Sequence, residues 1–267
     1  MTSGALAADY RSLLSAVAEA AVVALKFFES GAKVWEKAPG NPVTEADLAV
    51  DALLKDRLMT ARPGYGWLSE ESADNPRRLG CARVWIVDPI DGTRAFVRHA
   101  PEFTVCAGLV EDGRPVAGVV VNPVTGETFA AIAGGGCERN GERVRASDRR
   151  GLANAVILGS RHVVETAAGP LPATEFRKMN SIAYRMALVA AGTVDATLAM
   201  SGECDWDTAA AEILVSEAGG TVTDLAGDTI RYNREVPRHS GVIVAGAKLH
   251  GDLLGLLRRK AVAQPLT

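Results

Sequence analysis

Apolar residues recur at helical spacing in two segments near the start of the chain. Between residues 10 and 28 they fall three or four positions apart, and Gly31 follows where such a helix would stop. The segment 43–58 carries a similar stripe, and Thr44 with Asp47 three positions later matches a capping box at its start. Two amphipathic helices are therefore predicted, with Asp47 in the first turn of the second.

The middle of the chain has the pattern of β-strands. Residues 84–87 form a short apolar run, which favours a strand buried on both faces. Three apolar segments follow at 103–110, 115–122 and 127–133, separated by the turn sequences EDGR and PVTG, which predicts an antiparallel meander. The glycine-rich segment 134–142 contains an Asn-Gly pair but lacks the Gly-Lys-Ser/Thr ending of a phosphate-binding loop, so it is predicted to be a hairpin.

Beyond residue 150, predicted strands alternate with predicted helices, which is an α/β pattern. The strand patterns lie at 155–160, 195–200, 220–224 and 241–246, and the helical patterns at 181–192, 205–220 and 247–260. No linker or repeat interrupts the sequence. We therefore expect one compact unit over residues 1–267, with an N-terminal α+β subdomain that contains the meander (1–150) and a C-terminal α/β subdomain (151–267).

Composition narrows the class of protein. The chain has 267 residues, 48% of them hydrophobic, which suits a globular enzyme with a substantial core. A formal net charge of -3 gives no general attraction to nucleic acid or to an anionic membrane, so neither is expected as a partner. The four cysteines are widely spaced without a C-x-x-C pair, and the N-terminal segment lacks the features of a signal peptide or membrane span. A cytoplasmic location is expected.

The sequence WIVDPIDGT, residues 85–93, places two carboxylates at the end of a predicted strand. Pro89 presets the backbone for a turn, which brings Asp88 and Asp91 to the same side. Two carboxylates held together repel each other unless a cation lies between them, so a divalent metal is expected. Alone, an acidic turn after a strand is more often a solvated loop, and Asp47 alone is a favourable charge near a helix N-terminus.

Neighbouring residues extend this candidate site. Gly92 allows close backbone approach, and Thr93 offers a hydroxyl and an amide at a predicted helix start, which suits a phosphate. The other acidic candidates are two pairs, Glu70 with Glu71 and Asp205 with Asp207. Donor sets made only of oxygen favour Mg²⁺ or Mn²⁺ over Zn²⁺, and two such ions can clamp a phosphate and activate a water molecule. The combination predicts a phosphomonoesterase.

Three segments, WLSEES, WIVDPIDGTRAF and CDWDTAAAEILVSEAGG, occur in the order of the signature motifs of one protein family. They closely resemble the motifs of the inositol monophosphatase superfamily of magnesium-dependent, lithium-sensitive phosphatases, and NPVTEAD is similar to its N-terminal motif. The resemblance implies an αβαβα layered sandwich of the sugar-phosphatase type, and a homodimer. It covers nearly the whole chain.

The resemblance also implies metal ligands. Glu70 and Asp88, together with the carbonyl of Ile90, would hold a first Mg²⁺. Asp88, Asp91 and Asp207 would hold a second, and Glu70 with water would serve a weaker third ion. Mn²⁺ is an expected substitute.

Further roles follow from the same resemblance. Thr93 with Asp47 would orient or activate the attacking water, so these two residues and the metal ligand Glu70 are the expected catalytic residues. The amides of Gly92 and Thr93 would bind phosphate. Glu71 would support the site from behind, and Asp205 is the alternative to Asp207.

The expected substrate is a small phosphorylated metabolite. Three branches of the superfamily, each with its own substrate, resemble parts of this sequence. PEFTV and WDTAA resemble the 3'(2'),5'-bisphosphate nucleotidases, which remove the 3'-phosphate from 3'-phosphoadenosine 5'-phosphate, and this is the leading prediction. Its second phosphate requires a cation, for which Arg94, Arg161 and Arg185 are candidates because guanidinium pairs with phosphate in a bidentate manner. Each of these arginines is otherwise an ordinary surface charge.

The alternatives rest on other features. Inositol-1-monophosphatase is disfavoured by Ala199, which stands where that branch carries a glutamate, and DGTRAF resembles the histidinol-phosphatase branch. Some relatives act as non-catalytic, transcription-associated binding factors. Such a protein need not keep every metal ligand, whereas this sequence retains the full set, so catalysis is favoured.

Overall fold

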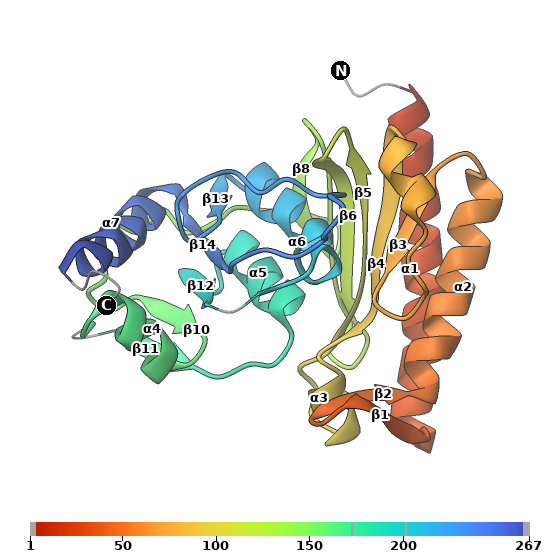
Figure 1. Cartoon of the computed structure of the whole chain (residues 1–267), viewed down its shortest axis with the longest axis horizontal. Helices are drawn as coiled ribbons and strands as arrows, with labels where there is room; N and C mark the ends of the chain where they lie inside the picture. The colour runs from red at the N-terminus through yellow and green to blue at the C-terminus, as the bar shows by residue number, and fades with distance from the viewer. Residues whose placement is uncertain (1–3, 172–173, 201, 264–267) are drawn as a thin grey trace.

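The computed structural model describes residues 4–171, 174–200 and 202–263 (Figure 1). In chain order its elements are α1 (Gly4–Ser30), β1 (Val34–Ala38), β2 (Asn41–Thr44), α2 (Glu45–Ala61), β3 (Gly66–Ser69), a 3₁₀ helix η1 (Pro76–Gly80), β4 (Arg83–Asp91), α3 (Thr93–Val97), β5 (Thr104–Glu111), β6 (Arg114–Asn122), β7 (Glu127–Ile132), β8 (Gly136–Arg139), β9 (Glu142–Val144), β10 (Val156–Leu158), α4 (Arg161–Ala168), β11 (Glu175–Arg177), α5 (Ile182–Ala190), β12 (Ala196–Ala199), α6 (Asp205–Glu217), β13 (Gly220–Thr223), β14 (Val242–Gly246) and α7 (Ala247–Ala263).

The elements stack in five layers (Figure 1). Helices α1 and α2 cover one face of a seven-stranded sheet, β3-β4-β5-β6-β7-β8-β9, and α5 and α6 cover its other face. A five-stranded sheet, β11-β10-β12-β14-β13, lies beyond α5 and α6, and α4 and α7 close the stack. The αβαβα sandwich expected from the family resemblance is confirmed.

The seven-stranded sheet contains the predicted meander. Strands β4, β5, β6 and β7 pair antiparallel in sequence order, and β8 pairs with β9 through the predicted hairpin, with Asn140 and Gly141 at positive φ. The sequence did not predict β3, which pairs parallel to β4 at the sheet edge and ends just before Glu70. This edge strand brings the Glu70 segment beside the end of β4.

The five-stranded sheet is mixed. Strand β10 pairs parallel with β11 and β12, whereas β14 pairs antiparallel with both β12 and β13. The predicted alternation of strands and helices is present, but α4 and β11 were not predicted. Both lie in the segment that joins β10 to α5.

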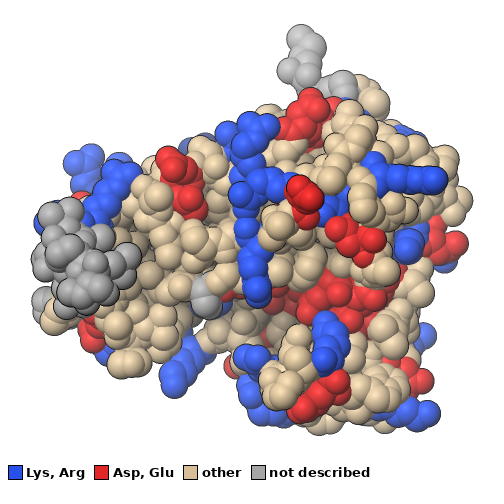
Figure 2. All heavy atoms as spheres, viewed as in Figure 1, with Lys and Arg blue, Asp and Glu red and all other residues tan. Residues whose placement is uncertain are grey.

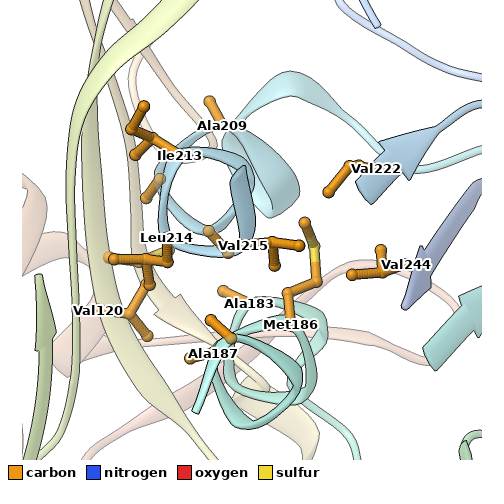
Figure 3. Packing of buried hydrophobic residues seen from close by; sticks show 14 of the residues in the cluster. Val120, Ala183, Met186, Ala187, Ala209, Ile213, Leu214, Val215, Val222 and Val244 are labelled. Carbon is orange, nitrogen blue, oxygen red and sulfur yellow. The ribbon is translucent and has the colours of Figure 1, made fainter. Parts of the chain in front are cut away.

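A shared hydrophobic core fills the space between the two sheets (Figure 3). Val120 of β6 packs against Leu214 of α6. On the other side of the cluster, Met186 of α5 lies beside Val215 of α6, toward Val244 of β14 in the other sheet. Burying each such side chain contributes about 1.5–3 kcal/mol. The core therefore takes residues from both sides of position 150, and the division into two subdomains remains a prediction from the sequence.

Two glycines allow α6 to lie directly against the seven-stranded sheet. A Cβ atom at Gly118 would stand 2.1 Å from the carbonyl oxygen of Ala210, and one at Gly108 would stand 3.1 Å from the Ala210 nitrogen. Side chains at these positions would push the helix away from the sheet. The close approach fixes the N-terminus of α6, which carries Asp207.

Some boundaries differ from the predicted ones. Helix α1 begins at Gly4 rather than near residue 10, and β4 continues to Asp91 rather than ending at residue 87. The predicted capping box of α2 is confirmed, since Thr44 caps the helix and Asp47 accepts a hydrogen bond from the Thr44 nitrogen at 2.8 Å. Among the described residues, no helix combines the length and apolarity needed to span a membrane.

Candidate active site

A bulge at the end of β4 sets the geometry of the acidic turn. Asp88 pairs with Cys106 and Asp91 with Thr104, so one extra residue is inserted on the β4 side. The Ile90 nitrogen donates to Oδ1 of Asp88 at 3.1 Å, which fixes the turn from within. The result places both carboxylates on the same side of the strand, as the sequence predicted.

Asp207 completes a cluster of three carboxylates. Oxygen atoms of Asp88, Asp91 and Asp207 all lie within 4.8 Å of one another. Asp207 stands in the first turn of α6, where its Oδ2 accepts from the Cys204 nitrogen at 2.5 Å. Burial, followed by repulsion from Glu70, Asp91 and Asp207, raises the pKa of Asp88 well above its usual range. A divalent cation would relieve this repulsion, and the donors present are the oxygen ligands that Mg²⁺ prefers.

Asp91 is held by the N-terminus of α5. The Ser181 hydroxyl donates to Oδ2 of Asp91 at 2.5 Å, and the Ala183 nitrogen donates to the same oxygen at 2.6 Å. Burial raises the pKa of Asp91 to about 6, although these hydrogen bonds act in the opposite direction. The sequence analysis missed Ser181, whose signal was a serine directly before a helical pattern.

Thr93 and Asp47 meet beside this cluster. Oγ1 of Thr93 lies 3.3 Å from Oδ1 of Asp47 and 3.0 Å from the carbonyl oxygen of Ile90. Asp47 is buried, and the Thr44 nitrogen and hydroxyl both donate to its other oxygen. Burial is the largest influence on the Asp47 carboxyl and raises its pKa. The pair can orient a water molecule and accept a proton from it.

Gly92 precedes this pair at a φ of 97°, in the left-handed region. A Cβ atom there would also stand 2.8 Å from the carbonyl oxygen of Glu102. Both the backbone conformation and the available space therefore require glycine at the turn into α3.

Glu70 and Glu71 share a cation from the β1–β2 hairpin. Nζ of Lys37 lies 2.8 Å from Oε1 of Glu70 and 2.7 Å from Oε1 of Glu71. Burial opposes the charge of Lys37, but the two carboxylates outweigh it and raise its pKa. Burial raises the pKa of Glu71 to about 7 despite its hydrogen bond to Lys37. Glu70 lines the cavity described below, whereas Glu71 is not among its described lining residues.

The carboxylates of Glu70, Asp88, Asp91 and Asp207 line one cavity of about 550 Å³, which we call the metal cavity. The predicted site residues in its lining are Glu70, Asp88, Ile90, Asp91, Gly92, Thr93, Arg94 and Asp207. Asn180, Glu203 and Arg238 also line it and were not predicted. Figure 2 shows acidic side chains gathered in a hollow of this face, with basic side chains beside it.

Comparison with known proteins agrees with this geometry. Residues 6–262 match the model of the Inositol monophosphatase family. The chain belongs to the inositol monophosphatase family.

Three relatives illustrate the range of the family. The chain is 36% identical over 226 residues to an inositol-1-monophosphatase of Rhizobium meliloti, covering 79% of this chain and 80% of that protein. It is 33% identical over 218 residues to the 3'(2'),5'-bisphosphate nucleotidase CysQ of Aggregatibacter actinomycetemcomitans, covering 78% and 81%. The crystal structure of the extragenic suppressor protein suhB from Bartonella henselae superposes with a TM-score of 0.82 at 29% identity, covering 93% of this chain and 98% of that one.

Within this family framework, the structure distinguishes Asp207 from Asp205. Asp205 is buried and turned away from the metal cavity, where its Oδ2 accepts from the Asn233 nitrogen at 2.6 Å. Its Oδ1 lies 2.8 Å from Nε2 of His239, which is also buried. Asp205 therefore anchors the loop that carries Arg238 to the cavity, which favours Asp207 as the metal ligand.

The three arginines proposed for a second phosphate lie in different places. Arg94 lines the metal cavity and donates from Nε to the Gly40 carbonyl at 2.9 Å. Arg185 lines an adjoining cavity. The structure does not support Arg161, which pairs with Glu165 at 2.8 Å and stacks over the Phe176 ring outside both cavities. The sequence could not show this, because α4 and β11 were not predicted.

The structure weakens the argument from Ala199 against an inositol phosphate. Ala199 is buried in β12 and does not belong to the described lining of the metal cavity. Glu203 is the acidic residue in the wall before Trp206 and Asp207. A carboxylate able to accept a hydrogen bond from a substrate hydroxyl is therefore present after all.

Proposed function

We propose that this protein is a Mg²⁺-dependent phosphatase that hydrolyses a phosphate monoester with a water molecule, and that its substrate is 3'-phosphoadenosine 5'-phosphate. The observation that carries the phosphatase assignment is the convergence of Asp88, Asp91 and Asp207 beside the hydroxyl of Thr93. Family membership supports the same class of reaction.

Two or three ions would be held by the acidic wall of the metal cavity. Asp88, Asp91 and Asp207 are the central ligands, with Glu70 and the carbonyl of Ile90 at the edge. When bound, Mg²⁺ neutralises phosphate charge and lowers the pKa of a coordinated water molecule. Mn²⁺ fits the same oxygen donors.

The chain itself positions the water and the phosphate. The Thr93 oxygen can accept a proton from the attacking water as the Thr93 hydroxyl passes its own proton to Oδ1 of Asp47. Asp47 is fixed by two hydrogen bonds from Thr44, so this acceptor is already oriented before substrate binds. The amides of Gly92 and Thr93 are proposed to bind the phosphate at the turn into α3.

The nucleotide is proposed on two grounds. The chain shares about a third of its residues with a bisphosphate nucleotidase over most of both sequences. Its PEFTV and WDTAA segments also resemble that branch. Inositol 1-phosphate is the second candidate, favoured by the Rhizobium meliloti relative and by Glu203 in the cavity wall.

Phosphate release from four substrates tests the assignment. 3'-phosphoadenosine 5'-phosphate, inositol 1-phosphate, histidinol phosphate and fructose 1,6-bisphosphate are compared at matched concentrations, with Mg²⁺ and with a chelator. A lead of the nucleotide in kcat/KM by about tenfold, or roughly 1.4 kcal/mol in transition-state preference, supports the proposal. A lead of inositol 1-phosphate or histidinol phosphate assigns the corresponding alternative.

The non-catalytic alternative has its own test. A host that lacks the corresponding gene is complemented with the wild type or with the Asp91→Asn variant, which removes a proposed metal ligand. Complementation by the variant would favour a transcription-associated binding role, whereas loss of complementation favours catalysis. The homodimer, lithium sensitivity and cytoplasmic location remain predictions.

A further inference from the structure

A second cavity adjoins the metal cavity. Its volume is about 420 Å³, and Asn180 belongs to the linings of both. Three basic residues line it, Arg98, Lys178 and Arg185. We call it the basic cavity.

No carboxylate offsets these charges within the described lining. The remaining described lining residues are neutral, and the carboxylates that act on Arg185, those of Asp91 and Glu203, line the metal cavity instead. Within the described part of the chain, the side chains of Arg98 and Lys178 have no hydrogen bond or ion pair, and the Arg185 side chain donates only from Nε to the Ser181 carbonyl at 3.3 Å. Cationic side chains with free donors that line one cavity offer charge-assisted hydrogen bonds to an anion.

Two short helices connect the basic cavity to the metal cavity. Helix α3 starts after Gly92 at the metal cavity, and Arg98 caps its other end at the basic cavity. At 1.5 Å per residue the helix axis covers about 7.5 Å between Thr93 and Arg98. Helix α5 starts at Ser181, which binds Asp91, and places Arg185 one turn later. Elements that fix the metal ligands therefore also fix the basic residues.

The arginines of the metal cavity are less suited to a second anion. Arg94 and Arg238 each donate from Nε to a backbone carbonyl, of Gly40 at 2.9 Å and of Gly202 at 3.1 Å. Five acidic side chains share that cavity, including Glu203. A second phosphate placed there would face carboxylates as well as cations.

We propose that the basic cavity binds the second phosphate of a substrate whose scissile phosphate lies in the metal cavity. This inference rests on the proposed function and deepens it, since it assigns the substrate to the nucleoside 3',5'-bisphosphates. The guanidinium groups of Arg98 and Arg185 can grip a phosphate in a bidentate manner, while Lys178 contributes a point charge. Asn180 lies between the two phosphates.

A matched pair of substrates tests the proposal. Adenosine 3',5'-bisphosphate, which is the proposed substrate 3'-phosphoadenosine 5'-phosphate, differs from adenosine 3'-phosphate only in the second phosphate. The test variant is Arg98→Gln/Lys178→Gln, since both side chains are exposed and neither has a hydrogen bond or ion pair among the residues that the structure describes. The control is Arg11→Gln/Lys26→Gln, which removes two exposed charges from α1, on the opposite side of the seven-stranded sheet.

The expected result is a selective loss. The test variant should lower kcat/KM for the bisphosphate by about ten- to a hundredfold, mainly through KM, because charge-assisted hydrogen bonds to phosphate are lost. Its kcat/KM for adenosine 3'-phosphate should change by less than about twofold, and the control should leave both substrates unchanged. Equal losses on both substrates, or no loss on either, would overturn the proposal.

Failure of the proposed function gives a different result. If the wild type hydrolyses neither nucleotide with Mg²⁺, binding of adenosine 3',5'-bisphosphate is measured by calorimetry in the wild type and the test variant. Binding that weakens about tenfold in the variant keeps the second-phosphate site without phosphatase activity. Equal binding, or none in the wild type, overturns the site as well.

Discussion

The metal cavity and the basic cavity share Asn180 but carry charges of opposite sign. The metal cavity gathers five acidic side chains, and its central carboxylates are fixed by the protein backbone. Asp91 accepts from the Ala183 nitrogen, and Asp207 accepts from the Cys204 nitrogen. The basic cavity gathers three cations, and two of them lie on exposed side chains without partners in the described structure.

This difference indicates how each cavity should respond to change. Buried carboxylates held by backbone donors are preorganised, so they cost stability without a cation and give precise geometry with one. Exposed lysine and arginine side chains adapt to a ligand and contribute affinity rather than geometry. Removal of a carboxylate from the metal cavity should therefore abolish the reaction. Removal of a cation from the basic cavity should change only the choice of substrate.

The largest effect should separate two aspartates of α6. Asp207→Asn removes a proposed metal ligand, and kcat/KM should fall roughly a thousandfold or more, which corresponds to about 4 kcal/mol. Asp205→Asn should keep activity within about tenfold and instead lower the free energy of unfolding by about 1–3 kcal/mol, since its partner His239 stays buried. Phosphate release and urea denaturation of both variants measure the two effects. The reverse pattern would make Asp205 the ligand.

A second effect concerns the water-activating pair. Thr93→Ala removes the hydroxyl that contacts Asp47, and kcat should fall about a hundredfold, the usual scale for one group in proton transfer. Thr93→Ser keeps the hydroxyl and serves as the matched control, with kcat within a few-fold of the wild type. Steady-state kinetics at saturating Mg²⁺ decides the point. Equal kcat values for the alanine and serine variants would contradict the assigned role.

Removal of metal tests the repulsion in the metal cavity. At a free Mg²⁺ concentration of about one hundred times Kd, binding should stabilise the wild type by about 2.7 kcal/mol, a shift of several degrees in Tm. Asp88→Asn should show little response to Mg²⁺, and its metal-free form should melt above the metal-free wild type because one buried repulsive charge is gone. Thermal melting with chelator and with Mg²⁺ measures both shifts. If Mg²⁺ does not change the Tm of the wild type, the result would argue against a metal site.

The smallest predicted effect concerns a buried carboxyl outside both cavities. Glu212 accepts a hydrogen bond from the Tyr232 hydroxyl at 2.6 Å, and burial raises its pKa from 4.5 to about 7. The folded protein therefore favours the protonated form, and this contribution to stability is full below pH 4.5 and disappears as pH rises through 7.

Glu212→Gln keeps the hydrogen-bond acceptor without the charge. The variant should be more stable than the wild type by about 2 kcal/mol at pH 8, below the full linkage value because relaxation reduces electrostatic costs. Near pH 5 the difference should largely vanish. Urea denaturation at the two pH values measures it, and a difference independent of pH would show that the glutamate is not titrating as described.

Much of the metal cavity could be predicted from the sequence because its key features are local. The sequence WIVDPIDGT encodes a strand end, a turn and a helix start within nine residues, and the structure forms all three there. The capping box at Thr44 and the antiparallel meander depend equally on neighbours in sequence. The other acidic residues of the site, Glu70 and Asp207, were predicted from the resemblance to the family motifs.

Tertiary structure decided what spacing along the chain leaves open. Asp205 and Asp207 are two positions apart, about 200° around a helix, and only the packing of α6 on Gly108 and Gly118 determines which one faces the cavity. Arg161 was a candidate because guanidinium pairs with phosphate, but its segment was not recognised as α4, and in that helix Arg161 stacks over Phe176 instead.

The basic cavity is the clearest case of a feature that sequence alone does not reveal. Arg98 and Arg185 are 87 positions apart, and the sequence analysis named Arg185 as a candidate cation but not Arg98 or Lys178. They line one cavity because α3 begins two residues after Asp91 and the N-cap of α5, Ser181, donates a hydrogen bond to Asp91. Local patterns determine turns and helix starts through contacts between near neighbours, whereas the convergence of distant charges depends on how completed elements pack.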